Sequence, residues 1–338
     1  MLTIAIPTRN RRRSLYARLG ELREIAEKRE DIVVLVSDNS DEPDHEIQHR
    51  YPFVRYHWNQ CNIGGGANFM RCIELAETEW VWLRGDDDPI HAAQITDVLD
   101  ALLEMSDADV VLLSHKLDSR LRLSGLHEEE PFPFDLLQSA GWISHVLFRV
   151  SSAKRNIRWG YFGIASGFAH FALLLGMMRN PGYRSGWVVP YSLKKGQFRD
   201  GLDDAAPKWQ YLETMLLRFP GVFSVLPDHL RYKAYRAWAS SLSFRLLLRS
   251  LVGTKIGYYA PERITWELFR YIRQGGRWRL AISLYLAGQI PSRIYCLVVP
   301  KLRDWVGIPV PSWVQGKQYH DLVRARIEKC RRIYEPFI

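Results

Sequence analysis

The sequence predicts an α/β fold, in which a largely parallel sheet is flanked by helices and followed by a basic helical region. Three observations predict it. Short apolar runs of strand character alternate with segments of helical periodicity through the first half of the chain. Polar segments follow directly after several of these strands. The composition, with 47% hydrophobic and 25% charged residues over 338 positions, is that of a globular protein with a large core.

The strands are predicted from apolar runs that are bounded by polar or turn-forming residues. The six predicted strands are Leu2–Ile6, Ile32–Ser37, Phe53–Trp58, Trp80–Leu83, Val110–Leu113 and Ile143–Phe148. Helical periodicity between them predicts three helices, which are Ser14–Lys28 with Ser14 as its N-cap, Ala67–Ala76, and His91–Leu103. Alternation of this kind favours a sheet of mostly parallel strands.

The pattern changes after the fifth strand. Residues 115–140 are predicted to be an irregular excursion, because Glu128–Glu130 is followed by Pro131 and Pro133. Helical periodicity then prevails at Ala165–Met178, at Lys208–Phe219 and over a long region from 229 to 285. We therefore expect one domain over residues 1–200 and a basic helical region over residues 201–338.

Charge is distributed unevenly along the chain. Residues 229–338 contain 20 Lys and Arg against 6 Asp and Glu, whereas the whole chain has a net charge of +9. Arg, Trp and Tyr are interleaved in this basic part, which suits a surface that lies on anionic lipid. A basic subdomain that packs on the front half explains the same composition. Leu280–Pro300 is interrupted by Gln289, Pro291 and Arg293, so it is not predicted to span a membrane.

Cysteine usage and the N-terminus predict a cytoplasmic protein. The four cysteines, Cys61, Cys72, Cys296 and Cys330, form no CxxC pair and no dense disulfide framework. The apolar run before Pro7 is too short for the core of a signal peptide, and we interpret it as a strand.

Three polar segments follow predicted strands and mark a site. They are Pro7–Asn10, Asp38–Asp41 and Asp86–Asp88. In parallel sheets, ligands bind beyond the carboxyl ends of the strands. Three adjacent carboxylates repel one another, and two of them can share a divalent cation, for which Mg²⁺ and Mn²⁺ with a diphosphate are typical. A solvated acidic turn that caps the following helix is the alternative.

Four motifs carry a resemblance to a known family. AIPTRNR near the N-terminus, VLVSDNSDE, NIGGGANF and WLRGDDD occur in this order. Together they resemble the nucleotide-sugar glycosyltransferases of inverting family 2, over about residues 1–180, whereas the tail resembles nothing we can name. The resemblance implies a GT-A-like, Rossmann-type sheet, a nucleotide-sugar donor and a divalent metal, Mn²⁺ or Mg²⁺.

The resemblance also implies roles for individual residues. Asp38 would accept a hydrogen bond from the base, which favours a UDP-sugar or dTDP-sugar. Asp86 and Asp88 would hold the metal. The nucleotide would lie along Pro7, Thr8, Asn10, Asn62, Gly64, Asn68, Asp86 and Asp87. An Asx turn at Asp38 and a helix-opening glycine loop are the structural alternatives.

The general base is the point at which the sequence departs from the family. Family members carry a Glu-Asp pair near a helix start, and this chain has Gly167–Leu173 at the comparable place. His170 is one candidate for the base, although a metal ligand, a phosphate ligand and a core histidine are equally open to it. Asp203 and Asp204 are the other candidates.

The expected function is sugar transfer to a glycan hydroxyl. The basic tail favours a lipid-linked glycan acceptor at the cytoplasmic face of the membrane, as in O-antigen or capsule assembly. Three alternatives stay open at this point: a nucleotidyltransferase, which would carry glycines that Pro7–Arg11 lacks; a catalytically silent scaffold; and a nucleic-acid-binding protein that uses the basic tail. Nucleic acid is not the expected partner, because the acidic front half repels phosphate. The sequence predicts neither the sugar nor the oligomeric state.

Overall fold

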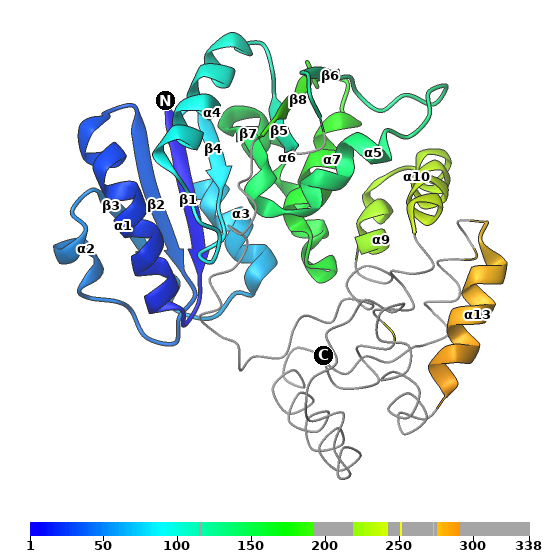
Figure 1. Cartoon of the computed structure of the whole chain (residues 1–338), viewed down its shortest axis with the longest axis horizontal. Helices are drawn as coiled ribbons and strands as arrows, with labels where there is room; N and C mark the ends of the chain where they lie inside the picture. Colours follow the sequence, from blue (N-terminus) through cyan, green and yellow to red (C-terminus); the bar gives the residue numbers. More distant parts are fainter. Residues whose placement is uncertain (115–116, 192–218, 243–250, 252–272, 274–275, 291–338) are drawn as a thin grey trace. The chain divides into compact units, whose positions relative to one another are not determined.

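The computed structural model describes residues 1–114, 117–191, 219–242, 251, 273 and 276–290 (Figure 1). The chain divides into two compact units, one of residues 1–202 with 222–230 and one of residues 203–221 with 231–338. The predicted functional division at residue 200 stays a prediction. None of the helices among the described residues is long and apolar enough to cross a membrane.

The first unit is built on one sheet. In the described part of the chain it has eight strands in the order β3-β2-β1-β4-β7-β5-β8-β6. The strands are β1 (Leu2–Thr8), β2 (Ile32–Asp38), β3 (Val54–Trp58), β4 (Trp80–Leu83), β5 (Val110–Ser114), β6 (Leu121–Leu123), β7 (Val146–Arg149) and β8 (Gly186–Pro190). Strands β3, β2, β1 and β4 run parallel, as do β5 and β8, while β7 and β6 are antiparallel to their neighbours. The mostly parallel α/β class predicted from the sequence is therefore confirmed.

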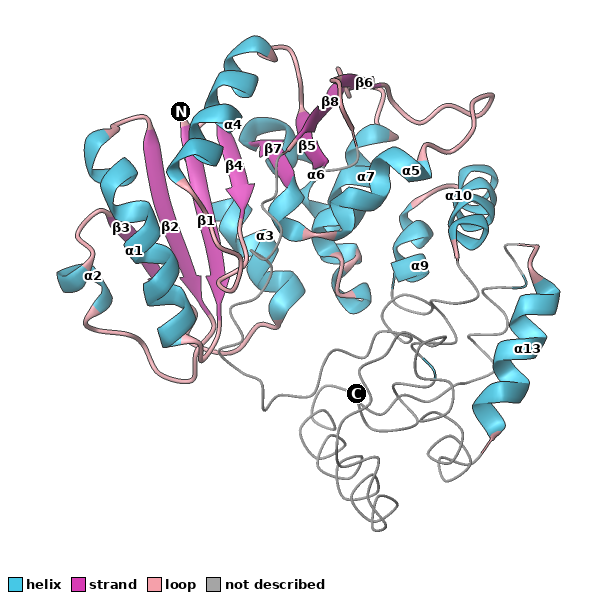
Figure 2. Cartoon of the chain, viewed as in Figure 1, coloured by secondary structure: helices cyan, strands magenta, loops and turns pink. Residues whose placement is uncertain are grey.

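Helices flank this sheet (Figure 2). One face is covered by α1 (Arg12–Lys28) and α4 (Ala92–Glu104), whose buried residues join alternate side chains of β1, β2 and β4 in one core. The other main helices of the unit are α3 (Gly65–Leu75), α6 (Val150–Phe162) and α7 (Ala169–Met178), which pack on one another. The shorter elements are α2 (Ile47–Arg50), α5 (Phe134–Leu137), η1 (Gln138–Gly141), η2 (Ile143–His145), η3 (Ile164–Ser166) and η5 (Val222–Val225).

The remaining described helices lie wholly or partly in the second unit. They are α9 (Phe219–Gly221), α10 (Asp228–Ser241) and α13 (Trp278–Gln289). The predicted helix Lys208–Phe219 falls outside the described residues except for its last residue, which begins α9. The predicted helical region from 229 to 285 is described only in the parts that α10 and α13 contain.

The structure corrects several predicted elements. Ser14 is not the N-cap of the first helix, because Asn10 has a left-handed φ of 53° and the chain enters the helix early, with Arg11 at the N-cap. The strand predicted to begin at Ile143 begins at Val146, after the 3₁₀ turn η2. The helix predicted from Ala165 is broken by the left-handed Gly167. Strands β6 and β8 were missed, β6 within the segment predicted to be irregular and β8 between the predicted helices Ala165–Met178 and Lys208–Phe219.

Candidate functional site

The three polar strand ends lie side by side at one edge of the sheet. Thr8 ends β1 opposite Asp38 at the end of β2, and β4 pairs with β1 on the other side. The strand order reverses here, since β2 and β3 lie on one side of β1 and β4 lies on the other. In open α/β sheets, this reversal is where the carboxyl ends of the strands leave a ligand crevice.

Asp86 is the buried centre of the acidic turn. Its side chain accepts hydrogen bonds from Thr8 Oγ1 at 2.7 Å and from the Arg11 guanidinium at 2.9 Å. Only 4% of the residue is exposed. Burial raises the pKa of Asp86, although Arg11 and Thr8 oppose the shift. The carboxylate is therefore held at some cost, and two donors do not fully replace the water it has lost.

The other two acids of the turn are more accessible. Asp87 is exposed, and its carboxylate lies 3.3 Å from the same nitrogen of Arg11. Asp88 is half-buried and accepts a hydrogen bond from the Ser144 hydroxyl, which also accepts the Gly85 N–H at 3.1 Å. Arg11, whose side chain is 47% exposed, thus places a positive charge on the carboxylates of the turn.

A buried arginine holds the turn in shape. Arg84 donates to the carbonyl oxygens of Asp88 at 3.2 Å and Pro89 at 2.7 Å, and its guanidinium lies 4.8 Å from the ring centre of Trp82. These contacts satisfy two backbone acceptors of the turn without using its carboxylates. Asp86 and Asp88 therefore keep their carboxylates at the edge of the sheet.

Asp38 lies at the end of β2 and is 2% exposed. It accepts the Ser40 N–H at 2.8 Å, the Ser40 hydroxyl at 2.5 Å and the Tyr56 hydroxyl at 2.8 Å. The Ser40 contacts make the Asx turn that the sequence allowed as an alternative. Next to it, Asn10 donates to Asp41 at 2.9 Å, which ties the turn after β1 to the turn after β2.

The glycine-rich loop opens α3. Gly64 has a φ of 84° and precedes the helix, and its N–H bonds Asn62 Oδ1 at 3.0 Å. Asn39 reaches across to the Gly64 carbonyl at 3.2 Å. Asn68, 2% exposed, donates to the Ser37 carbonyl at 2.9 Å and accepts the Ser37 hydroxyl at 2.6 Å. Pro7 is a buried residue of β1 that pairs with Ser37. The predicted residues of this loop thus join α3 to the ends of β1 and β2.

His170 lies in the interior of the first unit. It is 1% exposed in α7, with its ring centre 5.7 Å from that of Phe69 and 6.3 Å from that of Phe168. Neither ring nitrogen makes a hydrogen bond of good geometry. Burial lowers the pKa of His170 to about 4, so the ring is neutral at pH 7. The structure does not present it to solvent. Asp203 and Asp204 lie outside the described residues.

The protein side chains form only part of a metal site. Among the described residues there is no group of three His, Cys, Asp or Glu that could hold a metal ion. Asp86 and Asp88 nevertheless supply carboxylate oxygens on one turn. Such a pair fits Mg²⁺ or Mn²⁺, because these ions are commonly held by one or two carboxylates together with substrate phosphates and water.

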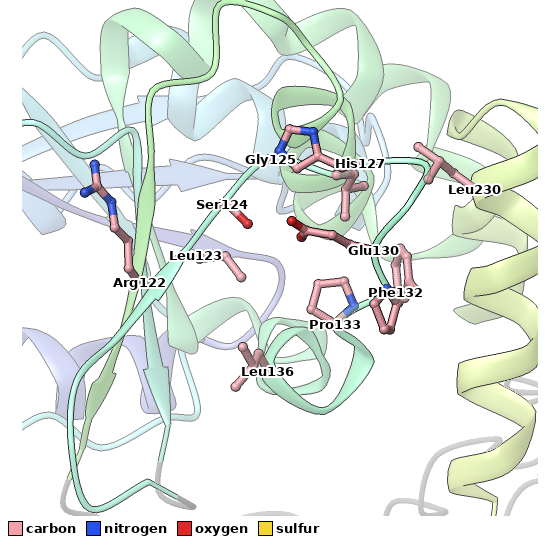
Figure 3. A pocket seen from close by; sticks show the side chains of 12 residues that line it. Arg122, Leu123, Ser124, Gly125, His127, Glu130, Phe132, Pro133, Leu136 and Leu230 are labelled. Carbon is pink, nitrogen blue, oxygen red and sulfur yellow. The ribbon is translucent and has the colours of Figure 1, made fainter.

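A separate cavity of about 80 Å³ lies in the same unit, near β6 and α5 (Figure 3). It contains none of the predicted site residues. Its wall is formed by Arg122, Leu123, Ser124, Gly125, Leu126, His127, Glu130, Pro131, Phe132, Pro133, Leu136 and Leu230. Strand β6 ends the sheet and is separated from β4 by three strands, so this cavity is remote from the acidic turn.

Sequence reasoning missed three residues that shape the site. Arg11 stood within the AIPTRNR motif, and its position beside an acidic turn could have been inferred from the parallel pairing of β1 and β4. Arg84 was visible as a charge at the end of an apolar strand. Ser144, 56 residues after Asp88, had no signal in the sequence.

Comparison with known proteins agrees with this geometry. Residues 3–161 match the model of glycosyl transferase family 2. An abequosyltransferase, RfbV of Salmonella typhimurium, is 28% identical over 123 residues, which cover 34% of this chain and 36% of the relative. The chain thus matches about a third of the length of this relative. The match to glycosyl transferase family 2 thus lies over residues 3–161, the part of the chain that contains the three polar strand ends.

Two solved structures of S. aureus TarS are similar over most of the chain. The structure of TarS 1-349 covers 98% of this chain and 91% of that one, with 17% identity and a TM-score of 0.47. The complex of the same protein with UDP-GlcNAc covers the same shares, with 15% identity and a TM-score of 0.44.

Proposed function

We propose that the protein transfers a sugar, with inversion, from a nucleoside diphosphate to a hydroxyl of a glycan, and that it uses Mn²⁺ or Mg²⁺. One observation carries the proposal. At the reversal of strand order, the buried Asp86 accepts hydrogen bonds from Thr8 at the end of β1 and from Arg11 at the N-cap of α1. A costly buried carboxylate at a ligand-binding edge is typical of a functional site.

The donor is proposed to lie along the three strand ends. Its base would lie near Asp38, whose carboxylate already accepts three hydrogen bonds, so the base would use the remaining acceptor capacity. A UDP-sugar or dTDP-sugar is favoured because both bases carry an N3–H donor. Thr8, Asn10, Asn62 and Gly64 would line the nucleotide, while Pro7 and Asn68 would hold the wall behind it.

Asp86 and Asp88 would hold the metal, and Asp87 would lie beside the nucleotide. When bound, the cation would neutralise the diphosphate and stabilise it as a leaving group. Arg11 lies on the oxygen of Asp86 that is not used by Thr8. Because a guanidinium and a cation repel each other, Arg11 would leave Asp86 as the metal binds, and the phosphates offer it a new partner.

The general base is proposed to come from one of two places. His170 would need the start of α7 to open, because its ring is buried. Asp203 and Asp204 are the other candidates. The base would take the proton from the acceptor hydroxyl as that oxygen attacks the anomeric carbon.

The acceptor is proposed to be a lipid-linked glycan in surface polysaccharide assembly, such as O-antigen or capsule. The similarity to an abequosyltransferase and the basic composition of residues 229–338 support this. We propose that the chain works at the cytoplasmic face of the membrane, where anionic lipid attracts basic residues.

A thermal-shift panel tests the donor site. Nucleoside diphosphates and nucleotide sugars are added with Mn²⁺, Mg²⁺ or EDTA to the wild type and to Asp88→Ala. A ligand that binds only the folded state raises the melting temperature. We expect one uracil or thymine nucleotide to do so with metal, and the mutant to lose the response. No response to any nucleotide under any metal would contradict the proposal.

A further inference from the structure

The helix α13 in the second unit exposes large apolar side chains along one face. Trp278 is 53% exposed, Ile282 39%, Leu286 60% and Ile290, directly after the helix, 37%. They recur every four residues, which places them in one stripe along a helix. Soluble surfaces carry single exposed apolar residues, but a continuous stripe of four marks an interaction surface.

The opposite side of the same helix packs against other residues of its unit. Leu280 and Gly288 are buried, and Ala287 is half-buried. Arg277, at the N-cap, donates to the carbonyl oxygens of Ala239 and Leu242 in and just after α10, which fixes the helix within its unit. In the described part of this unit, the helix thus packs through one side and exposes the four apolar residues of the stripe on the other.

The charge around the exposed stripe of α13 indicates which kind of partner binds it. The helix contains no acidic residue, and Arg279 lies with its guanidinium 5.3 Å from the ring centre of Trp278. Residues 229–338 as a whole contain 20 basic against 6 acidic residues. A Trp beside an Arg, next to branched apolar side chains, suits the interface of a bilayer, where the ring and the aliphatic groups insert and the cation meets phosphate.

We propose that this stripe, Trp278, Ile282, Leu286 and Ile290, is the face with which the protein lies on an anionic bilayer. The helix would lie in the plane of the headgroups, with its stripe among the acyl chains. The inference names the surface for the membrane association in the proposed function, and it rests on that part of it but not on the donor chemistry.

Vesicle binding tests the proposal. The full-length chain is sedimented with phosphatidylcholine vesicles that either contain or lack phosphatidylglycerol. The test variant is Ile282→Ser with Leu286→Ser, which removes apolar surface but no charge. The matched control is Leu103→Ser, because Leu103 is 79% exposed on α4 of the first unit. Leu286→Ser alone is the second variant, in case the double variant does not fold.

We expect the wild type and Leu103→Ser to bind anionic vesicles, and the stripe variants to bind at least about tenfold more weakly at unchanged melting temperature. Equal binding of wild type and stripe variants would overturn the proposal. A dimer that becomes a monomer in the variants would overturn it in favour of a second copy. A lower melting temperature with unchanged vesicle binding would overturn it in favour of cover by the chain itself.

The same variants are given nucleotide and Mn²⁺ in the thermal-shift panel. A retained nucleotide response with lost vesicle binding supports the surface. If the wild type binds nucleotide but no anionic vesicle, the membrane-surface proposal is contradicted and the donor site is not. A wild type that binds vesicles through the stripe but responds to no nucleotide leaves the surface standing and contradicts the donor site.

Discussion

Asp86 and Asp109 are both buried carboxylates paired with an arginine, yet their pKa values move in opposite directions. Asp109, 1% exposed at the start of β5, accepts the Arg184 N–H at 2.8 Å, two contacts from its guanidinium and the Ser152 hydroxyl at 2.5 Å. Burial works to raise its pKa, but these hydrogen bonds outweigh it and the pKa is lowered. Among the described residues, the side chain of Asp86 accepts hydrogen bonds from Thr8 and Arg11 alone, and burial prevails.

The difference separates a structural acid from a functional one. Asp109 has donors on both carboxylate oxygens from groups that also connect β5, α6 and the segment before β8. Asp86 lies at the opposite, ligand-binding end of the sheet with fewer donors. An acid left short of donors keeps an affinity for a cation or a phosphate-bound metal that a fully bonded acid lacks.

The largest expected effect on stability is from Asp109→Asn. The change removes a buried charge and turns an amide N–H₂ toward the donors of Arg184, so we expect a loss of about 3 kcal/mol. Urea unfolding measures it. A loss below about 1 kcal/mol would mean that Asp109 is not the structural acid of this comparison.

Asn68→Ala is expected to follow, with a loss of about 2 kcal/mol, because it removes the acceptor of the buried Ser37 hydroxyl and a donor to the Ser37 carbonyl. Asn62→Ala is the control, since Asn62 is exposed and its side chain accepts hydrogen bonds from the Gly64 N–H at 3.0 Å and, at a longer 3.3 Å, from Asn39. The two variants are compared by the same unfolding measurement. Equal losses would show that Asn68 does not hold α3 to the strand ends.

Asp86→Asn is expected to leave stability unchanged or to raise it by up to about 1 kcal/mol, because it removes a carboxylate whose burial is unfavourable. The nucleotide response with metal should be lost in the same variant. Asp109→Asn, in contrast, is expected to lose stability and to keep the nucleotide response. A large loss of stability in Asp86→Asn would contradict the functional interpretation of the site.

The pH dependence of stability sharpens the comparison. Asp109 has a lowered pKa in the folded state, so its contribution is present above the ordinary carboxyl value of about 4 and is lost as pH falls through the folded pKa. Asp86 has a raised pKa, so its ionisation costs stability at neutral pH and the cost disappears as pH falls. The gap in melting temperature between Asp86→Asn and the wild type should therefore narrow toward pH 4.

The smallest effect on stability is expected from Arg11→Gln, within about 1 kcal/mol, since the guanidinium is half-exposed. Its effect on ligands should be larger. Without Arg11 on Asp86, Mn²⁺ alone should raise the melting temperature more than in the wild type. Arg12→Gln is the matched control, because Arg12 pairs with Asp44 and not with the acidic turn. Equal melting-temperature responses of the two variants to Mn²⁺ would contradict the idea that Arg11 and the metal compete for Asp86.

The sequence predicted the ligand-binding edge because it depends on rules that act locally. Parallel strands place their carboxyl ends together, so Thr8 and Asp86 could be brought near each other from 78 residues apart. The acidic turn and the glycine loop were also visible as motifs. Five of the six predicted strands were confirmed to within two residues.

What could not be predicted depends on tertiary contacts. Whether a carboxylate is structural or functional depends on how many donors reach it, and the donors of Asp109 come from Ser152 and Arg184. Ser144 donates to Asp88 from the 3₁₀ turn η2, which precedes the antiparallel strand β7. The sequence placed the start of that strand at Ile143 instead of Val146. The burial of His170 had one signal, because every residue of α7 is apolar except the histidine, which is typical of a fully buried helix.

The most direct test of the account is a calorimetric titration of UDP and dTDP with Mn²⁺ into Asp86→Asn and Asp109→Asn, at a temperature at which both are folded. The account predicts that Asp109→Asn binds one of the nucleotides with the affinity of the wild type and that Asp86→Asn does not bind it. Binding by Asp86→Asn at wild-type affinity would contradict the claim that this carboxylate belongs to the donor site.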